Sequence, residues 1–417
     1  MRIMQESGVG RWVLVLLLAL GACTPTGRPP AVSLAPPPTS LPATFQLRDR
    51  ELQDGRFVAL AFSGGGSRSA VFAAAVMKEL DRLALLPQVD VLSAVSGGAI
   101  PAAAYALDGY QGLNFQNGFL EQIGQDFQQD LAGPWYSAPA ALLRYKVTRT
   151  IPADLVIRVL DDKIFHGATF ADLNPSRPLL LLNSTDALTG EPFVISSEAF
   201  ASLHQPLASL SVARAVYMSA AYPGLMEPIP LYDGDGNGER ADRPTLLIYD
   251  GGPADNLGIR TVMRVLDRAA AQRPMPELFP RGCLVIAVDA TGRSMDNSEP
   301  MSAASVLLKS HRREVLELAG IPEAEQDRAR FGSFSVGRNG SSGRCRFWHV
   351  ALRHLPDSDS LGARATRVKT SLALSPEEQS ALADAAVRLV QEGKEEAERT
   401  GDLAEFLGAA PSARNGP

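Results

Sequence analysis

Blocks of apolar residues along the chain predict strands separated by helices. The strand-like runs lie at residues 57–62, 89–95, 179–182, 246–249 and 284–288. Residues 70–86, after the first run, place apolar side chains at helical spacing. Short runs that are apolar throughout are typical of parallel strands covered on both faces. The pattern therefore predicts an α/β fold in which helices flank a mostly parallel central sheet.

Two further segments have helical patterns. Residues 154–165 carry apolar side chains along one side, which fits either a helix packed on the core or a mobile cap that meets lipid. Ser375, Pro376 and Glu378 form a helix start, with a serine cap, a proline in the first turn and a glutamate that can reach back. We expect this helix to end near Glu392, followed by a polar tail over residues 393–417.

The N-terminus has the features of an export signal. Arg2 and Arg11 precede an apolar run over residues 12–20. The run ends in Leu20-Gly21-Ala22-Cys23, which resembles a bacterial lipobox, so residues 1–22 are the expected signal peptide and Cys23 the expected lipidation site. A lipidated chain would be held by its acyl chains in the bacterial cell envelope. Thr24, in place of aspartate, favours the outer membrane by the same resemblance.

Composition sets the domain boundaries and excludes some partners. Residues 23–44 are rich in proline and small polar residues, as in an extended tether, and residues 45–392 have the composition of a globular domain. The net charge of −6, without a basic domain, argues against nucleic acid as a partner. After residue 22 no apolar stretch is long enough to span a bilayer.

Two sequence features leave alternatives open. Cys283 and Cys345 each lie at the start of a strand-like run, and in an exported protein they could form a disulfide or remain two buried thiols. Residues 233–238 (Asp-Gly-Asp-Gly-Asn-Gly) resemble the start of a calcium loop, but Pro244 occupies the position of the bidentate glutamate. We interpret this segment as a hairpin tip, with calcium as the lesser alternative.

Candidate catalytic residues follow three of the predicted strands. Ser96 lies in Ala94-Val95-Ser96-Gly97-Gly98, whose small residues suit the sharp turn of a nucleophile elbow. Asp250, followed by two glycines, could accept the serine proton directly. Gly64, Gly65 and Gly66 could offer N–H groups to an oxyanion at a helix N-terminus, with the positive charge of Arg68 nearby. None of the five histidines lies in a segment typical of a Ser-Asp-His triad.

With these motifs the chain resembles the patatin-like phospholipases over roughly residues 55–290. Further similar segments are Asn183-Ser184-Thr185-Asp186, Ser219-Ala220-Ala221-Tyr222-Pro223-Gly224 and Asp255-Asn256-Leu257-Gly258. Two positions depart from the family pattern: Ser69 and Ala94 replace glycines, and both replacements are small.

The resemblance implies a three-layer patatin-like fold and a lipid acyl hydrolase with a Ser96–Asp250 dyad. The substrate would be a phospholipid or another acyl ester, and no metal or other cofactor would be required. Two alternatives remain open: an esterase or thioesterase acting on non-lipid substrates, and a catalytically weak lipid-binding envelope lipoprotein. The head group, acyl length and bond cleaved do not follow from the sequence.

Overall fold

A computed structural model describes residues 47, 49–127, 129–131, 150–234, 243–292, 331–335, 344–356, 358–401 and 403–407. The expected signal peptide, Cys23 and the tether lie outside these residues. So do residues 235–242, which include most of the calcium-like segment. Within the described part of the chain, no helix has the length and apolar content needed to cross a bilayer.

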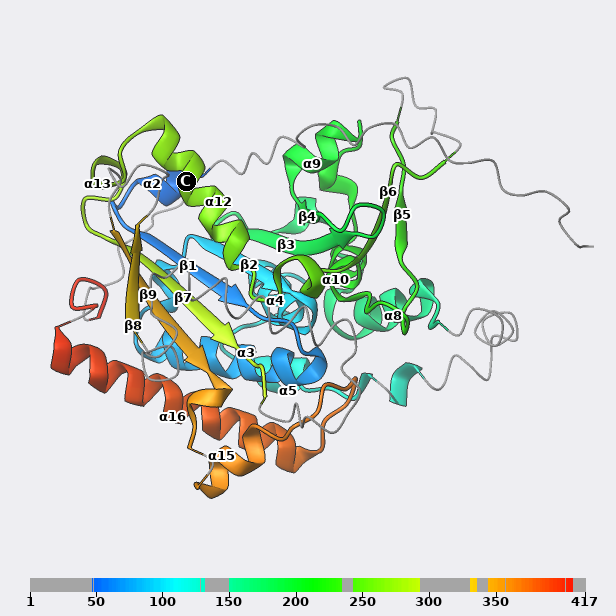
Figure 1. Cartoon of the computed structure of the whole chain (residues 1–417). Coiled ribbons are helices and arrows are strands. Elements are labelled where there is room, and N and C mark those ends of the chain that lie inside the picture. Colours follow the sequence, from blue (N-terminus) through cyan, green and yellow to red (C-terminus); the bar gives the residue numbers. More distant parts are fainter. Residues whose placement is uncertain are drawn as a thin grey trace, which may run out of the picture. The chain divides into compact units, whose positions relative to one another are not determined.

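The centre of the fold is a mixed nine-stranded sheet whose middle strands are parallel (Figure 1). The parallel strands, in spatial order, are β3 (Leu179–Asp186), β2 (Val91–Val95), β1 (Phe57–Phe62), β7 (Cys283–Asp289) and β9 (Arg344–Ala351). Antiparallel strands extend both sides: β4 (Pro192–Ile195), β5 (Ile229–Leu231), β6 (Leu246–Asp250) and β8 (Phe331–Ser335). The predicted α/β class with a mostly parallel sheet is confirmed.

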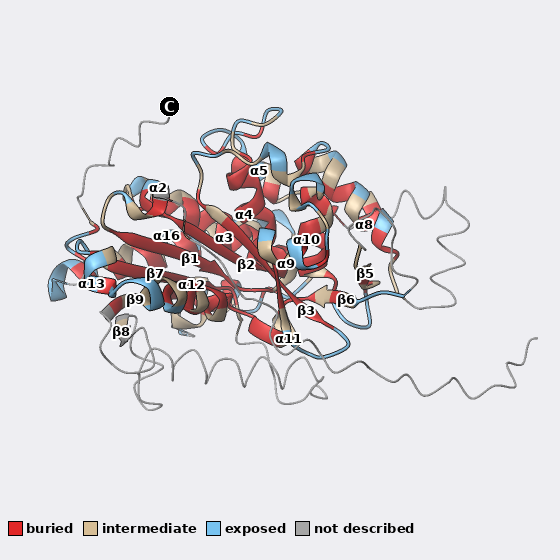
Figure 2. Ribbon diagram, turned by 90° about the horizontal axis from the view of Figure 1, so that it is seen from above, coloured by how far each residue is buried: buried red, intermediate tan, exposed pale blue. Residues whose placement is uncertain are grey.

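Helices cover both faces of this sheet and make it the middle of three layers (Figure 1). Alternate residues of β1 enter different cores, because side chains alternate between the faces of a strand. Val58, Leu60 and Phe62 face the larger core, formed with α3 (Gly66–Arg82), α4 (Ala99–Ala106), α8 (Ala153–Leu160), α10 (Val212–Ala220) and α16 (Pro376–Thr400). Phe57, Ala59 and Ala61 face the smaller core under α12 (Ile259–Gln272). The central strands are accordingly buried throughout (Figure 2).

Short helices complete the connections between these elements. They are α2 (Asp49–Leu52), α5 (Phe119–Ile123), α9 (Ser197–Ser202), α11 (Gly252–Asp255), α13 (Met275–Leu278) and α15 (Ser360–Ala365). Single 3₁₀ turns occur at Leu86–Gln88, Ser96–Gly98, Phe170–Asp172, Leu207–Ser209 and Leu352–His354, and a π turn at Asp161–Phe165.

The two amphipathic segments pack on the core. In α8 the apolar side chains Leu155, Val159 and Leu160 are buried, so the core-helix interpretation holds over the mobile-cap one. The helix that starts at Ser375 has the predicted capping box but continues to Thr400, beyond the expected end at Glu392. It continues because Gly393 and Ala397 keep the buried face in register. The prediction that a polar tail begins at residue 393 is therefore wrong.

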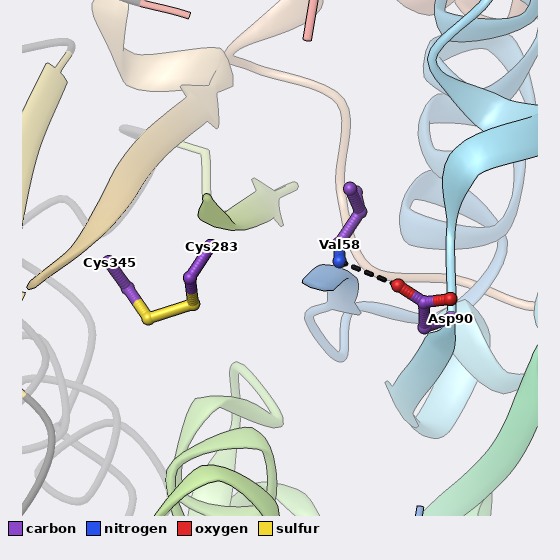
Figure 3. Close-up of a disulfide and its surroundings, with 4 residues drawn as sticks. All are labelled: Val58, Asp90, Cys283 and Cys345. Atoms are coloured by element: carbon purple, nitrogen blue, oxygen red, sulfur yellow. Dashed lines mark hydrogen bonds between the residues drawn. A yellow bond between two sulfur atoms is a disulfide. The ribbon is translucent and has the colours of Figure 1, made fainter. Parts of the chain in front are cut away.

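The two cysteines form a disulfide between neighbouring parallel strands (Figure 3). Leu284 of β7 pairs with Arg346 of β9, which places Cys283 opposite Cys345, with their Cα atoms 4.6 Å apart. That separation is within the range that a disulfide requires. The same figure shows Asp90, whose carboxylate accepts the N–H of Val58 at 2.8 Å and so fixes the start of β1.

Candidate active site

The carboxyl ends of β2 and β6 meet along one edge of β3. Val95 of β2 pairs with Asn183, and Asp250 of β6 pairs with Ser184, the next residue of β3. β4 pairs with residues 182–185 of β3 and so occupies the opposite edge of that strand. β2 and β6 must therefore share the remaining edge of β3, where they lie end to end. Ser96 and Asp250 therefore follow strand ends that meet, as the sequence predicts, although β6 is antiparallel to β3 and approaches from the other direction.

Ser96 occupies a sharp turn between β2 and α4. Its φ angle is 53°, a left-handed conformation that is uncommon for a residue other than glycine. The backbone N–H of Ser96 donates to the hydroxyl of Ser219 at 3.0 Å, and that hydroxyl donates to the Asn183 carbonyl at 2.6 Å. A strained turn held by such bonds is what a nucleophile elbow requires.

Asp250 is a buried carboxylate, 4% exposed, held beside Ser96. The N–H of Gly252 donates to its Oδ1 at 2.7 Å, and the Ser96 side chain also hydrogen-bonds to it. Burial raises the pKa of Asp250 to about 6, against the lowering effect of these two hydrogen bonds. A carboxylate with a pKa of about 6 is ionised at neutral pH yet basic enough to accept a proton from a hydroxyl.

The glycine loop between β1 and α3 has only two available donors of the three expected. The N–H of Gly64 donates to the Asn256 carbonyl at 3.0 Å and cannot also face an oxyanion, which corrects the expectation for Gly64. The N–H groups of Gly65 and Gly66 have no acceptor among the described residues. Their φ angles of 139° and 58° are readily adopted only by glycine.

Glycines also allow the loop and the elbow to touch. A Cβ on Gly97, the residue after Ser96, would lie 1.9 Å from the carbonyl oxygen of Gly66. A Cβ on Gly64 would lie 3.3 Å from the Cβ of Ser96. The available N–H groups of the loop are therefore brought next to the serine that would generate the oxyanion.

Arg68 supports the loop from the other side. Its Nη1 donates to the Val368 carbonyl at 2.8 Å, and its guanidinium packs against Gly65. Burial lowers the pKa of Arg68, and the nearby Asp289 opposes that effect. These contacts favour a structural brace with a positive charge close to the loop.

A buried polar network positions the elbow, and the sequence alone did not assign it a role. The Asn183 amide donates to Ser93 Oγ and to the Ala94 carbonyl, both at 3.0 Å, while its oxygen accepts from Thr261 at 2.6 Å. Ser93 in turn donates to the Gly258 carbonyl at 2.6 Å. Asn183 and Ser219 lie in segments that the family resemblance marks, and that was the available signal for them.

The histidines in and next to β9 belong to a separate buried cluster. His349 Nε2 lies 3.2 Å from Asp289, whose carboxylate also accepts from Arg353 at 2.9 Å. Burial alone would raise the Asp289 pKa, but Arg353 and His349 hold it well below its usual range. Asp289 ends β7, and the following Ala290 N–H donates to Ser63 Oγ at 2.9 Å. The cluster therefore supports the strand end beside the glycine loop.

Metal ligands do not gather in the described part of the chain. No group of three or more histidine, cysteine, aspartate or glutamate side chains there is placed to hold an ion. Of the calcium-like segment only Asp233 and Gly234 are described, and Asp233 pairs with His204 at 2.9 Å.

Comparison with known proteins identifies the domain. Residues 60–263 match the family model described as patatin-like phospholipase. This span begins within β1 and contains the glycine loop, the Ser96 elbow and Asp250. Residues 60–263 thus form a patatin-like phospholipase domain. No curated protein sequence matches the chain.

The chain is also similar to solved structures. Human GIVD cytosolic phospholipase A2 aligns with 87% of this chain and 61% of its own at 12% identity, with a TM-score of 0.53. VipD from Legionella pneumophila aligns at 13% identity over 82% and 67% of the two chains, with a TM-score of 0.38. The type III effector protein ExoU aligns at 15% identity over 82% and 53%, with a TM-score of 0.35. The chain spans about three fifths of the human phospholipase, and the similarity to it shows the fold alone.

Proposed function

We propose that this protein hydrolyses acyl esters of lipids with Ser96 as nucleophile and Asp250 as general base. The observation that carries the proposal is the pairing of a strained, nearly buried serine with a hydrogen-bonded carboxylate whose pKa is about 6. The patatin-like domain supports lipid esters as the substrate class. The available N–H groups of Gly65 and Gly66 next to Ser96 would receive the oxyanion.

The reaction follows from these positions in two halves. Ser96 Oγ attacks the ester carbonyl carbon while Asp250 takes its proton, and the carbonyl oxygen becomes an oxyanion held by the glycine loop. The C–O bond to the leaving alcohol breaks as Asp250 returns the proton to that oxygen, leaving an acyl group on Ser96. Water then attacks the acyl carbon, gives its proton to Asp250 and releases the fatty acid, and Ser96 recovers its proton.

A substrate panel tests this proposal against its alternatives. We expect hydrolysis of phosphatidylcholine or lysophosphatidylcholine as well as p-nitrophenyl butyrate, with fluorophosphonate inhibition of all three. Hydrolysis of the soluble ester alone would favour the non-lipid esterase. Binding of phospholipid without hydrolysis of any of the three would favour the lipid-binding lipoprotein.

The pKa of Asp250 predicts the pH dependence of hydrolysis. Because the base must be ionised, kcat/KM for p-nitrophenyl butyrate should rise about tenfold per pH unit below pH 6 and level off above it. The measurement is a pH–rate profile between pH 4.5 and 8.5 with the melting temperature recorded at each point. A rate that stays level down to pH 4.5, as an aspartate with its ordinary pKa of about 4 would give, would contradict the raised pKa of a buried base.

We further propose that acyl chains on Cys23 tether the domain to the bacterial outer membrane through the proline-rich segment. The support is the sequence pattern of residues 1–44 alone. Cells that express the wild-type chain should incorporate radiolabelled palmitate into it, and Cys23→Ser should abolish incorporation and membrane retention. Wild-type protein without label that still sediments with membranes would overturn the lipid anchor and leave the hydrolase untouched.

A further inference from the structure

Two large apolar side chains are exposed in a four-residue turn beside the candidate active site. Among the described residues, the exposed large apolar side chains are Leu188, Tyr222, Leu225 and Val387. Tyr222 and Leu225 are 42% and 44% exposed, and Pro223 and Gly224 between them are exposed as well. Apolar side chains scattered singly on a surface need no explanation, but a group within one turn does.

Backbone hydrogen bonds hold this turn in place. The N–H groups of Leu225 and Met226 both donate to the Tyr222 carbonyl, at 3.2 and 2.9 Å. The Leu225 carbonyl accepts the N–H of Ile151 at 2.8 Å, and the buried side chain of Met226 anchors the far end. The result is a preformed apolar projection, hereafter the 222–225 turn.

Hydrogen bonds tie the same segment to the site. Ala221, the residue before the turn, accepts the backbone N–H of Asp250 at 3.0 Å. Ser219, two residues earlier, binds the backbone of Ser96 and accepts the N–H of Gly251 at 3.2 Å. The turn therefore directly follows the residues that position Ser96 and Asp250.

The turn also lacks charge. Residues 220–226 contain no charged side chain, and the protein carries a net charge of −6. Such a segment offers no positive charge to attract an anionic surface, whereas a tyrosine and a leucine suit the boundary of a neutral bilayer.

The geometry points to the 222–225 turn as the element by which the protein inserts into a lipid surface and takes substrate from it. This inference rests on the proposed lipid hydrolase function. The partner is the interface of a zwitterionic bilayer, into which Tyr222 and Leu225 insert while Asp250 and Ser96 lie behind them. Binding is driven by apolar burial and is insensitive to salt.

The test compares the turn with a matched apolar site elsewhere. Residues 24–417 are used, since every described element lies in the compact unit that begins at Leu41. The variants are Leu225→Ser, Tyr222→Ser and their combination, with Val387→Ser as control, because Val387 is 41% exposed on α16. Cosedimentation with phosphatidylcholine vesicles, hydrolysis of vesicle lipid and hydrolysis of p-nitrophenyl butyrate are measured for each.

We expect each single variant to weaken vesicle binding by about tenfold and the double variant more, with the ratio of vesicle to soluble-ester hydrolysis falling in parallel. Val387→Ser should match the wild type.

Equal binding by the double variant and the wild type would overturn the inference, as would binding that 0.5 M salt abolishes. An equal loss of hydrolysis on vesicle lipid and on p-nitrophenyl butyrate would assign the turn to the active site instead. A change in the molecular mass of the protein in solution without lipid would assign the turn to self-association. Cosedimentation without hydrolysis in the wild type would reject the hydrolase proposal while still testing the turn.

Discussion

Ser96→Ala is expected to lower ester hydrolysis by at least about 10⁴-fold while leaving the melting temperature close to that of the wild type. The hydroxyl supplies the attacking oxygen, whereas the backbone bond from Ser96 to Ser219 survives the substitution. Asp250→Asn should lose nearly as much, because the amide keeps the bond from Gly252 but cannot accept the proton. The double variant should be no worse than Ser96→Ala, since the two residues act as a unit. Initial rates on p-nitrophenyl butyrate measure all three.

Histidine variants supply the control for this result. His204→Ala removes an exposed side chain paired with Asp233 and should retain wild-type rates. His349→Gln tests the buried cluster with Asp289 and should act through stability, seen as a lower melting temperature. A well-folded histidine variant without activity would replace the dyad by a triad, and hydrolysis by Ser96→Ala would exclude Ser96 as nucleophile.

Gly97→Ala is expected to lower kcat by about 10³-fold, because the added methyl group cannot fit between the elbow and the glycine loop. Its Cβ would lie 1.9 Å from the Gly66 oxygen and 2.6 Å from the Gly66 carbonyl carbon, and both are backbone atoms. One of the two segments must shift, which moves the oxyanion donors away from Ser96. Gly234→Ala is the matched control, since its Cβ meets nothing closer than 3.4 Å. Wild-type kcat in Gly97→Ala would show that the loop has no part in catalysis.

Two neighbouring variants separate the donor from its brace. Gly66→Val should be as severe as Gly97→Ala, since Gly66 has φ +58° and its Cβ would meet the Ser371 carbonyl oxygen at 2.5 Å. Arg68→Ala removes the bond to the Val368 carbonyl and should cost less, about tenfold in rate, with a lowered melting temperature. A fall in kcat at an unchanged melting temperature would instead give the Arg68 charge a direct role at the oxyanion.

Local sequence patterns were sufficient to predict many of the elements and the positions of Ser96 and Asp250 at strand ends. The apolar run before Ser96 and the small residues around it define a buried strand and a tight turn, whatever lies next to them. The serine cap and proline at Ser375 and Pro376 likewise fix a helix start from four residues. These features depend on neighbours in the chain, and the structure agrees with them.

Features that depend on distant partners were missed or left open. Residues 246–249 do not determine the direction of β6, because an apolar strand has the same residue pattern in a parallel and in an antiparallel pair. The use of the Gly64 N–H by the Asn256 carbonyl and the register that joins Cys283 to Cys345 both follow from packing between segments far apart in sequence. The same holds for Gly393 and Ala397, whose burial carries α16 beyond Glu392.

The central claim is that Ser96 attacks the acyl carbon with Asp250 as its base, and covalent trapping tests it most directly. The protein is treated with a fluorophosphonate at pH 7.5, where Asp250 is ionised. It is then digested and analysed by tandem mass spectrometry. We predict a single phosphonylated residue, Ser96, no adduct in Ser96→Ala, and adduct formation slowed by at least about 10²-fold in Asp250→Asn. An adduct on another residue, or labelling of Ser96 at the wild-type rate in Asp250→Asn, would contradict the dyad.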